Sequence, residues 1–336
     1  MQRALELARL GFGNVSPNPM VGCVIVHREK IIGEGYHRQY GGPHAEVNAI
    51  NSVEDKSLLP DSDIYVTLEP CSYFGKTPPC ADLLVKHKVK KVYISTIDPN
   101  PKVSGKGIEI LKRAGIEVSQ GLLEEEGSGL NKRFFTSIQH LRPYIILKWA
   151  ETSDGFIARK NFDSKWISNE LSRRLVHKWR AEEDAILVGK NTAKHDDPTL
   201  NVRDWQGNDP LRIVIDHELQ LSTDLNLFDK QIPTICYNLI KAEAMEGLTF
   251  VKLAEASFIH DLIADLHQKN IQSIIIEGGR KTLTDFIEVG LWDEARVFRS
   301  DSCFGGGIRS PQLINASFDG KEKIDGDTLT YFRHTK

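Results

Sequence analysis

Short apolar runs of strand length alternate with helix-patterned segments along almost the whole chain. The first half contains VGCVIV (21–26), DIYVTL (63–68) and KVYIST (91–96), and the second half continues with DAILVG, LRIVID, PTICYN, SIIIEGG and EARVF. Apolar runs of four to eight residues between helical segments are typical of buried strands in α/β proteins. The pattern therefore predicts an α/β sandwich with a largely parallel sheet.

Helical segments fall between these runs in the first half of the chain. Residues 2–10 have an amphipathic pattern, and VGCVIV with the following IIGEG suggests a hairpin. Further helices are expected from about His44, from about Cys80 and over GKGIEILKRAG, with a last one reaching about His140; a short strand, IEVS, is expected at 116–119.

A domain boundary is expected near HLRPYIILKW (140–149). The chain has 336 residues, and domains average about 150 residues, so two domains are expected. Arg142 precedes a proline, which ends the helix before it, and a new apolar strand follows at once. The predicted domains are residues 1–141 and 142–336.

Composition excludes several classes of protein. The chain is 40% hydrophobic and 26% charged with a net charge of -3, which fits a soluble globular protein and gives no general attraction to nucleic acid. No apolar run approaches the ~20 residues that a membrane helix needs. The five cysteines are odd in number and scattered, unlike a disulfide framework, so we expect a cytoplasmic protein in which some of them bind metal.

The stretch GGPHAEVNAI (41–50) raises the first functional question. His44 and Glu46 are two residues apart, so on a regular helix they would point to different sides. They converge if His44 stands at the helix cap. In TLEPCSYFGKTPPC (67–80), Cys71 and Cys80 each follow a proline, which suits the start of a helix, where the dipole favours a thiolate.

One imidazole and two thiolates around Zn²⁺ would leave a fourth position for water, the pattern of a catalytic zinc site. Zinc lowers the pKa of its water towards about 7. Glu46 could then take the proton of that water and return it to a leaving amine, as in zinc-dependent base deaminases. The alternative is a closed structural site with Cys23 as fourth ligand, although Cys23 lies in an apolar run and is interpreted as a core residue.

The second half offers a different set of polar residues. SIIIEGGRKTLTDFIE passes from a strand through Glu-Gly-Gly into a helix, where backbone N–H groups can meet a phosphate, but a plain turn explains the glycines equally well. Lys148 lies inside the apolar run YIILKWA and must extend to solvent or pair with a carboxylate. Asp196 could be catalytic or only part of the turn Asp-Asp-Pro.

Specific motifs then point to one family. HAEVNAI, VTLEPCSYFGKTPPCADLL and DPNPKVSGKG, with eight residues between the two cysteines, resemble the bifunctional riboflavin-biosynthesis deaminase–reductase family over nearly the whole chain. The resemblance implies a cytidine-deaminase-like α/β/α sandwich (1–141) followed by a dihydrofolate-reductase-like α/β domain (142–336). It implies Zn²⁺, NADPH and a phosphorylated pyrimidine substrate. We also expect a homo-oligomer, with no nucleic acid and no membrane as partner.

The implied reactions are sequential. The first is the hydrolytic deamination of 2,5-diamino-6-(5-phosphoribosylamino)pyrimidin-4(3H)-one to 5-amino-6-(5-phosphoribosylamino)uracil, and the second is the NADPH-dependent reduction of the ribosyl group to ribityl. Two other interpretations stay open from the residues alone. One is a nucleic-acid base deaminase with an accessory module, and the other is a non-catalytic zinc and nucleotide sensor in which Glu46 is incidental.

By resemblance, the matching positions have assigned roles. The zinc ligands are His44, Cys71 and Cys80. The catalytic residues are Glu46, Lys148, Asp196 and Glu277. The cofactor contacts are Ala150, Trp166, Thr192, Asp196, Gly279, Arg280, Lys281 and Thr282. The substrate contacts are Asn18, Lys76, Thr77, Ser164, Arg180, Leu200, Arg203 and Glu277.

Two segments depart from the family pattern. TSDG (152–155) stands where SLDG is common, and VFRSDSCFGGGIRSP (297–311) replaces a more apolar strand and an Ala-Pro turn expected near the cofactor. The second departure means that the edge of the nicotinamide pocket can differ from the family pattern, while the fold is expected to be the same.

Overall fold

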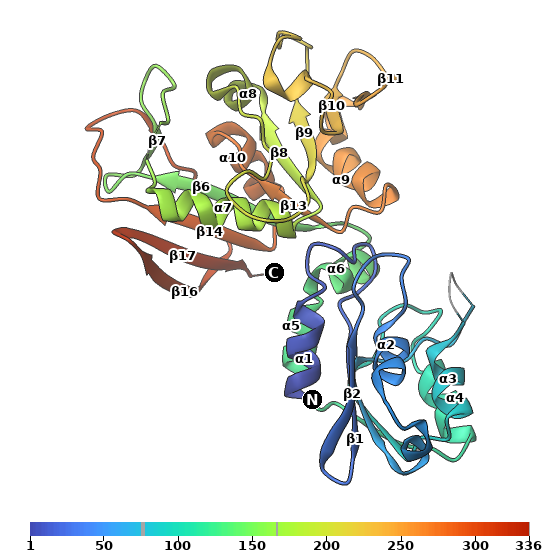
Figure 1. Ribbon diagram of the computed structural model, residues 1–336. Coiled ribbons are helices and arrows are strands. Elements are labelled where there is room, and N and C mark those ends of the chain that lie inside the picture. Colours follow the sequence, from blue (N-terminus) through green and yellow to red (C-terminus); the bar gives the residue numbers. More distant parts are fainter. Residues whose placement is uncertain (75–77, 166, 336) are drawn as a thin grey trace. The chain divides into compact units, whose positions relative to one another are not determined.

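The computed structural model describes residues 1–74, 78–165 and 167–335, which form two compact units, Met1–Leu141 and Arg142–Lys336 (Figure 1). Among the described residues, no helix combines the length and the apolar character needed to cross a membrane.

The first unit is built on a five-stranded sheet in the order β2-β1-β3-β4-β5. Its strands are β1 (Gly22–His27), β2 (Lys30–Tyr36), β3 (Asp63–Leu68), β4 (Lys91–Thr96) and β5 (Glu117–Gln120). β1 runs antiparallel to β2 and β3, whereas β3, β4 and β5 are parallel. The parallel part of this sheet is thus smaller than the sequence predicts, because the opening hairpin contributes an antiparallel half.

Helices cover both faces of this sheet. They are α1 (Gln2–Arg9), α2 (Ala45–Ser52), the 3-10 turn η1 (Lys56–Asp61), α3 (Cys80–Lys86), α4 (Lys106–Arg113), α5 (Glu124–Leu130) and α6 (Lys132–His140). α1 and α5 lie on one face and α2, α3 and α4 on the other (Figure 1). The single helix predicted to end near His140 is therefore two helices, which meet at Asn131.

Close helix–sheet contact depends on glycine at two strand positions. A Cβ added at Gly22 would lie 1.9 Å from the carbonyl oxygen of Ala4 in α1, and one at Gly35 would lie 2.3 Å from the backbone nitrogen of Ala49 in α2. A larger residue at either place would force the helix away from the sheet.

Asn131 fixes the loop that carries Asn18. Its side-chain oxygen accepts the Met20 N–H at 2.8 Å, and its amide donates to the Met20 carbonyl at 2.9 Å. Asn131 is buried, so both hydrogen bonds replace lost contacts with water.

The second unit contains a ten-stranded sheet in the order β11-β12-β10-β9-β8-β13-β6-β14-β17-β16. Its strands are β6 (Tyr144–Glu151), β8 (Ala185–Gly189), β9 (Leu211–Ile215), β10 (Thr234–Asn238), β11 (Glu243–Met245), β12 (Leu248–Lys252), β13 (Ser273–Ile276), β14 (Glu294–Arg299), β16 (Ala316–Ile324) and β17 (Asp327–His334). The strands from β12 to β14 in this order are parallel, and antiparallel strands close both edges. β7 (Phe156–Ala158) and β15 (Ile308–Arg309) form a separate pair.

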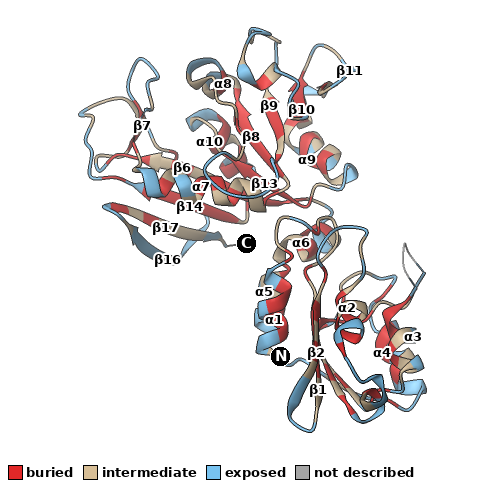
Figure 2. Ribbon diagram, in the orientation of Figure 1, coloured by how far each residue is buried: buried red, intermediate tan, exposed pale blue. Residues whose placement is uncertain are grey.

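Two helices cover each face of this sheet. α7 (Glu170–Glu182) and α8 (Lys190–Asp196) pack against one cluster of buried strand residues, and α9 (Phe258–Gln268) and α10 (Arg280–Glu288) pack against the other. Two short 3-10 turns, η2 (Asn226–Phe228) and η3 (Glu255–Ser257), lie in the connections. β8 and β13 are buried along their whole length, as expected of central parallel strands (Figure 2).

The hairpin of β16 and β17 at the sheet edge is a feature that the sequence pattern does not predict. β16 is mostly exposed and polar, so it has no continuous apolar run (Figure 2). Charged residues on an edge strand also hinder unwanted pairing with other chains.

Replacement of Asn131 by alanine should destabilise the first unit. It would leave the buried N–H and carbonyl of Met20 without partners, and we expect the free energy of unfolding to fall by about 2–4 kcal/mol. Urea denaturation of the full chain would measure the loss, and hydrogen exchange at residues 11–21 should accelerate. Asn51→Ala, at an exposed position of α2, is the matched control. Equal stability of the two variants would contradict this account.

Candidate active sites

The structure brings His44, Cys71 and Cys80 together in the first unit. His44 is the N-cap of α2, Cys71 follows β3, and Cys80 is the first residue of α3. His44 Nδ1 lies 3.5 Å from Cys71 Sγ and 3.4 Å from Cys80 Sγ. All three ligand atoms lie within 4.8 Å of one another.

This spacing fits a zinc ion. Zn–S bonds of about 2.3 Å and Zn–N bonds of about 2.0–2.1 Å at a tetrahedral angle separate sulfur from nitrogen by about 3.6 Å. Within the described part of the chain, no fourth histidine, cysteine or carboxylate completes the group. Cys23 belongs instead to the buried core of the sheet and is 0% exposed, which argues against the closed four-ligand site.

Hydrogen bonding already favours thiolate at this position. A hydrogen bond from Cys80 lowers the pKa of Cys71 to about 4, although burial opposes the shift, and His44 adds to it. The pKa of Cys80 rises, because its proton is held against Cys71 and because the side chain is buried. The backbone N–H of Cys80 also donates to Cys71 Sγ at 3.3 Å.

Glu46 lies in the first turn of α2, two residues beyond His44, and is 3% exposed. Burial raises the pKa of Glu46 to about 7, and the charge of Cys71 adds to the shift. A carboxyl group with such a pKa can both accept and release a proton near neutral pH.

His37 is a residue that the sequence analysis did not select. Its Nε2 lies 3.1 Å from the side-chain nitrogen of Asn18, and its Nδ1 lies 3.0 Å from the Pro43 carbonyl. The rings of His37 and His44 pack edge to face with centroids 5.5 Å apart. Asn18 thus belongs to the surroundings of the metal cluster. His37 is an isolated histidine in a loop, so nothing in the sequence indicated that it would contact Asn18 and His44.

Glu69, in the LEPC segment, is a second residue that was missed. Its buried carboxylate accepts the backbone N–H groups of Gly105 at 2.9 Å and Gly107 at 3.0 Å, with longer bonds from Asp98 and Ile108. Glu69 therefore ties the loop that begins with DPNP to the strand end that carries Cys71. The sequence did offer one sign of such a role, because Glu69 is a charged residue directly after the apolar strand 63–68.

Three of the predicted site residues, Lys76, Thr77 and Trp166, lie outside the described residues.

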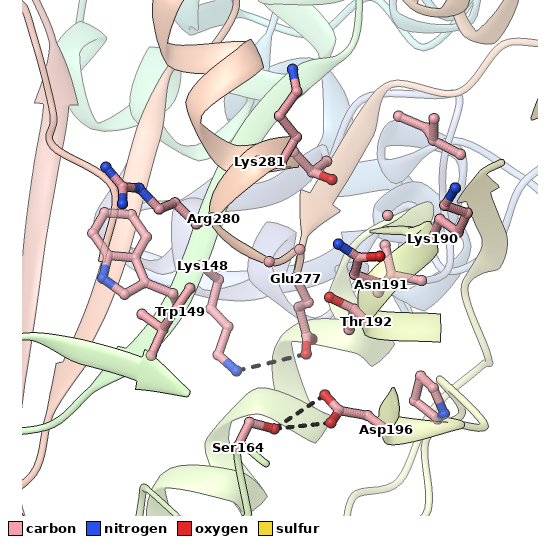
Figure 3. A pocket seen from close by; sticks show the side chains of 18 of the residues that line it. Lys148, Trp149, Ser164, Lys190, Asn191, Thr192, Asp196, Glu277, Arg280 and Lys281 are labelled. Atoms are coloured by element: carbon pink, nitrogen blue, oxygen red, sulfur yellow. Dashed lines mark hydrogen bonds and ion pairs between the residues drawn. The ribbon is translucent and has the colours of Figure 1, made fainter. Parts of the chain in front are cut away.

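A cavity of about 1130 Å³ in the second unit holds the other predicted residues (Figure 3). It opens where β6, β8 and β13 end and α8 and α10 begin. All the described residues predicted for the reductase site line it: Lys148, Ala150, Ser164, Arg180, Thr192, Asp196, Leu200, Arg203, Glu277, Gly279, Arg280, Lys281 and Thr282.

A buried carboxylate with two cations stands at the centre of this cavity. Glu277 accepts two hydrogen bonds from Arg180, at 3.0 and 2.8 Å. Its carboxylate also lies 3.6 Å from Lys148 Nζ (Figure 3). Burial alone would raise the pKa of Glu277, but the charges of Arg180 and Lys148 outweigh it and lower the pKa to about 2. Burial lowers the pKa of Lys148, and Glu277 partly offsets this. Lys148 thus pairs with a carboxylate rather than extending to solvent.

Asp196 faces this pair from α8. Ser164 donates to both of its carboxylate oxygens, at 3.0 and 3.2 Å (Figure 3). Burial raises the pKa of Asp196, and the hydrogen bond from Ser164 opposes the shift.

The starts of α8 and α10 meet at one wall of the cavity. A Cβ at Gly189 would lie 2.2 Å from Thr282 Oγ1, and one at Gly278 would lie 2.9 Å from Thr282 Cβ. Gly279 is the N-cap of the nine-residue helix α10. Glycines here bring backbone N–H groups to the cavity wall, which suits the pyrophosphate of a dinucleotide such as NADPH.

The two departures from the family pattern contact each other. Asp154 of the TSDG turn accepts the backbone N–H groups of Phe304 at 3.2 Å and Gly305 at 2.8 Å, and Cys303 Sγ lies 3.0 Å away. Ile308, in the same segment, lines the cavity. The segment 297–311 therefore contributes Ile308 to the lining of the pocket, and the polar turn at Asp154 holds residues 303–305 of the same segment.

Comparison with known proteins agrees with both halves of this geometry. The family described as the cytidine and deoxycytidylate deaminase zinc-binding region matches residues 1–96, and the RibD C-terminal domain matches residues 143–322. The riboflavin biosynthesis protein RibD of Aquifex aeolicus is 41% identical over 330 residues, covering 96% of this chain and 92% of that protein. The RibD protein of Escherichia coli is 37% identical, covering 92% of this chain and 89% of that protein.

Solved structures agree over the whole length. A diaminohydroxyphosphoribosylaminopyrimidine deaminase/5-amino-6-(5-phosphoribosylamino)uracil reductase from Thermotoga maritima superposes with a TM-score of 0.92 at 37% identity, covering 99% of this chain and 97% of that chain. RibD from Acinetobacter baumannii gives 0.91 at 33% identity, covering 100% and 98%. The chain belongs to the RibD family of riboflavin biosynthesis, with a zinc-binding deaminase domain followed by a reductase domain.

Proposed function

We propose that residues 1–141 deaminate 2,5-diamino-6-(5-phosphoribosylamino)pyrimidin-4(3H)-one by hydrolysis, and that residues 142–336 then use NADPH to reduce the ribosyl group of the product to ribityl. The observation that carries the proposal is the three-ligand cluster with no fourth described ligand, next to a buried glutamate. A purely structural zinc site needs neither feature.

For the deaminase, the proposed zinc ligands are His44, Cys71 and Cys80. Zinc bound there would supply the Lewis acidity that makes water acidic enough to react near neutral pH. The buried carboxyl group of Glu46 would accept a proton from that water and deliver it to the departing amino group. Burial raises the pKa of Glu46, which favours this exchange. Asn18, held by His37, contacts the pyrimidine, and Lys76 and Thr77 contact the rest of the substrate.

For the reductase, NADPH would supply the hydride for the open carbonyl form of the sugar. The residues proposed to hold the cofactor are Ala150, Trp166, Thr192, Asp196, Gly279, Arg280, Lys281 and Thr282. The carbonyl oxygen also needs a proton, which a side chain in the cavity can supply directly or through water. The pKa of Glu277 is lowered to about 2, which disfavours Glu277 as a donor. Asp196 accepts hydrogen bonds from Ser164 on both oxygens, which favours its ionised form although burial raises its pKa. Lys148 pairs with Glu277, and burial lowers its pKa, which eases the release of a proton. We therefore assign the donor role to Lys148 and an orienting role to Glu277.

Two arginines were expected to bind the substrate phosphate, but their surroundings differ. The donors of Arg180 are engaged by Glu277 and by the Asn201 carbonyl. The Arg203 side chain is 52% exposed and keeps open donors. We assign the phosphate chiefly to Arg203, with Leu200 and Ser164 against the rest of the substrate.

Several broader expectations remain predictions. All five cysteines are free, which supports a reducing compartment such as the cytoplasm. Self-association stays a prediction from the sequence.

Replacement of Glu46 by glutamine distinguishes a deaminase from a non-catalytic zinc and nucleotide sensor in which Glu46 is incidental. Glutamine keeps the shape but cannot carry the proton, so ammonia release should fall by about 10²–10⁴-fold. Metal analysis should still find bound zinc. Glu54→Gln, at an exposed position after α2, is the control. If the Glu46 variant released ammonia at the normal rate, Glu46 would be incidental.

Replacement of Cys71 by alanine should separate the two activities. Loss of one of three ligands removes zinc and deamination, while the reduction of pre-deaminated substrate should keep most of its rate, because the reductase cavity lies in the other unit. Cys23→Ala, a core change, should retain zinc. Zinc loss from the Cys23 variant at unchanged stability would revive the closed-site alternative.

The role of Lys148 predicts a pH dependence of reduction. A donor must be protonated, so kcat should fall as pH rises through the pKa of Lys148, and burial puts that fall below the usual lysine value of about 10.4. Lys148→Met should lower kcat by about 10²-fold or more. A variant rate close to the wild-type rate, followed as NADPH absorbance, would rule out this donor.

A further inference from the structure

The loop that carries Leu200 and Arg203 is held against α7 by a histidine that the proposed mechanism does not use. His177 and Arg180 lie one turn apart on α7, and both line the reductase cavity. His177 is 3% exposed. Both ring nitrogens of a buried histidine need hydrogen-bond partners, even when the residue has no catalytic role. These partners therefore show which part of the structure the side chain holds in place.

Both ring nitrogens of His177 contact consecutive residues of the loop. The backbone N–H of Arg203 donates to His177 Nδ1 at 3.4 Å. His177 Nε2 lies 3.2 Å from Asp204 Oδ2. A neutral imidazole has one N–H, so Nδ1 as acceptor requires the proton on Nε2, which donates to Asp204.

The charges around the ring favour this neutral form. Burial lowers the pKa of His177, and the cations Arg180 and Arg203 lower it further, while Asp204 and Glu277 oppose the shift. A protonated ring could not accept the Arg203 N–H. The neutral tautomer therefore suits a side chain that holds the loop.

The contrast between the two arginines gives this contact a function. The Arg180 guanidinium is held directly by Glu277. Among the described residues, the Arg203 guanidinium makes a 3.4 Å bond to Asn201 Oδ1 and a 3.6 Å contact with Asp204. The exposed guanidinium is held less tightly than that of Arg180, so the position of its backbone matters more. His177 contacts both this backbone and Asp204, while Asp209 accepts the N–H of the neighbouring Val202 at 2.6 Å.

We propose that His177 is a positioning residue of the reductase, which fixes the backbone of Arg203 so that its guanidinium meets the phosphate of the substrate. This inference rests on the proposed function of Arg203 as a phosphate contact. It goes further by making the affinity for phosphorylated substrate depend on a hydrogen bond between His177, in the cavity wall, and the backbone of Arg203.

The test uses the full chain, NADPH and two substrates, 5-amino-6-(5-phosphoribosylamino)uracil and its dephosphorylated form. The variants are His177→Phe, which keeps a ring without hydrogen bonds, His177→Asn, whose side-chain oxygen can replace Nδ1, and Arg203→Met. His334→Phe, outside the cavity lining, controls for the substitution itself.

We expect His177→Phe to raise KM for the phosphorylated substrate about tenfold, because the part-buried Arg203 N–H loses its partner and the guanidinium is held less well against the phosphate. We expect kcat to change by less than about threefold. KM for the dephosphorylated substrate and the dissociation constant of NADPH, measured by fluorescence, should stay near wild type. His177→Asn should recover most of the lost affinity. The double variant should bind phosphorylated substrate no worse than Arg203→Met alone, since both changes remove one contact.

The outcomes separate two failures. If Arg203→Met leaves KM for phosphorylated substrate unchanged, the proposed phosphate role of Arg203 is wrong, and the inference falls with it. If Arg203→Met raises this KM but His177→Phe does not, or raises KM equally for both substrates, Arg203 keeps its role and the positioning role of His177 is overturned. Failure of His177→Asn to recover affinity would overturn it as well.

Discussion

Both candidate sites depend on one constraint of parallel α/β structure. The helix that follows each parallel strand begins beside the carboxyl end of that strand. At the start of such a helix, the first N–H groups have no partner within the helix, so they can stabilise anions. Cys71 and Cys80 stand between the end of β3 and the start of α3, and Gly189 joins β8 directly to α8. In the first unit, the residues from the end of a strand to the start of the following helix include two cysteines. In the second unit, the corresponding residues include glycine, threonine and glutamate.

Two buried glutamates illustrate how surroundings decide chemistry. Burial raises the pKa of Glu46 to about 7, because no cationic side chain outweighs it there. Glu277 is also buried, yet Arg180 and Lys148 lower its pKa to about 2. Pairs of titratable groups with pKa values moved apart in this way usually have different roles. Glu46 is suited to carry a proton, whereas Glu277 is suited to hold two cations in place.

The elements and the local motifs were predictable from sequence, because strand-length apolar runs and Pro-Cys pairs act over short distances. β3 and β4 have the bounds that their apolar runs predict. The contacts that organise the sites join distant positions and left no pattern. Glu69 reaches a loop more than thirty residues away, and His177 binds residues 203 and 204 across the cavity wall. The exposed hairpin at the sheet edge was missed for another reason, since an edge strand needs no buried apolar face.

Net charge is also a poor guide to what the second unit binds. The whole chain has a charge of -3, which argues against nucleic acid. The described residues lining the reductase cavity nevertheless include eight cationic side chains, Lys148, Lys165, Arg173, Arg180, Lys190, Arg203, Arg280 and Lys281, against five carboxylates. Low-dielectric walls concentrate such a field, so a chain with a net negative charge can still attract a phosphorylated substrate and a dinucleotide into one cavity. These cations are spread over more than a hundred residues of sequence, and only the fold gathers them.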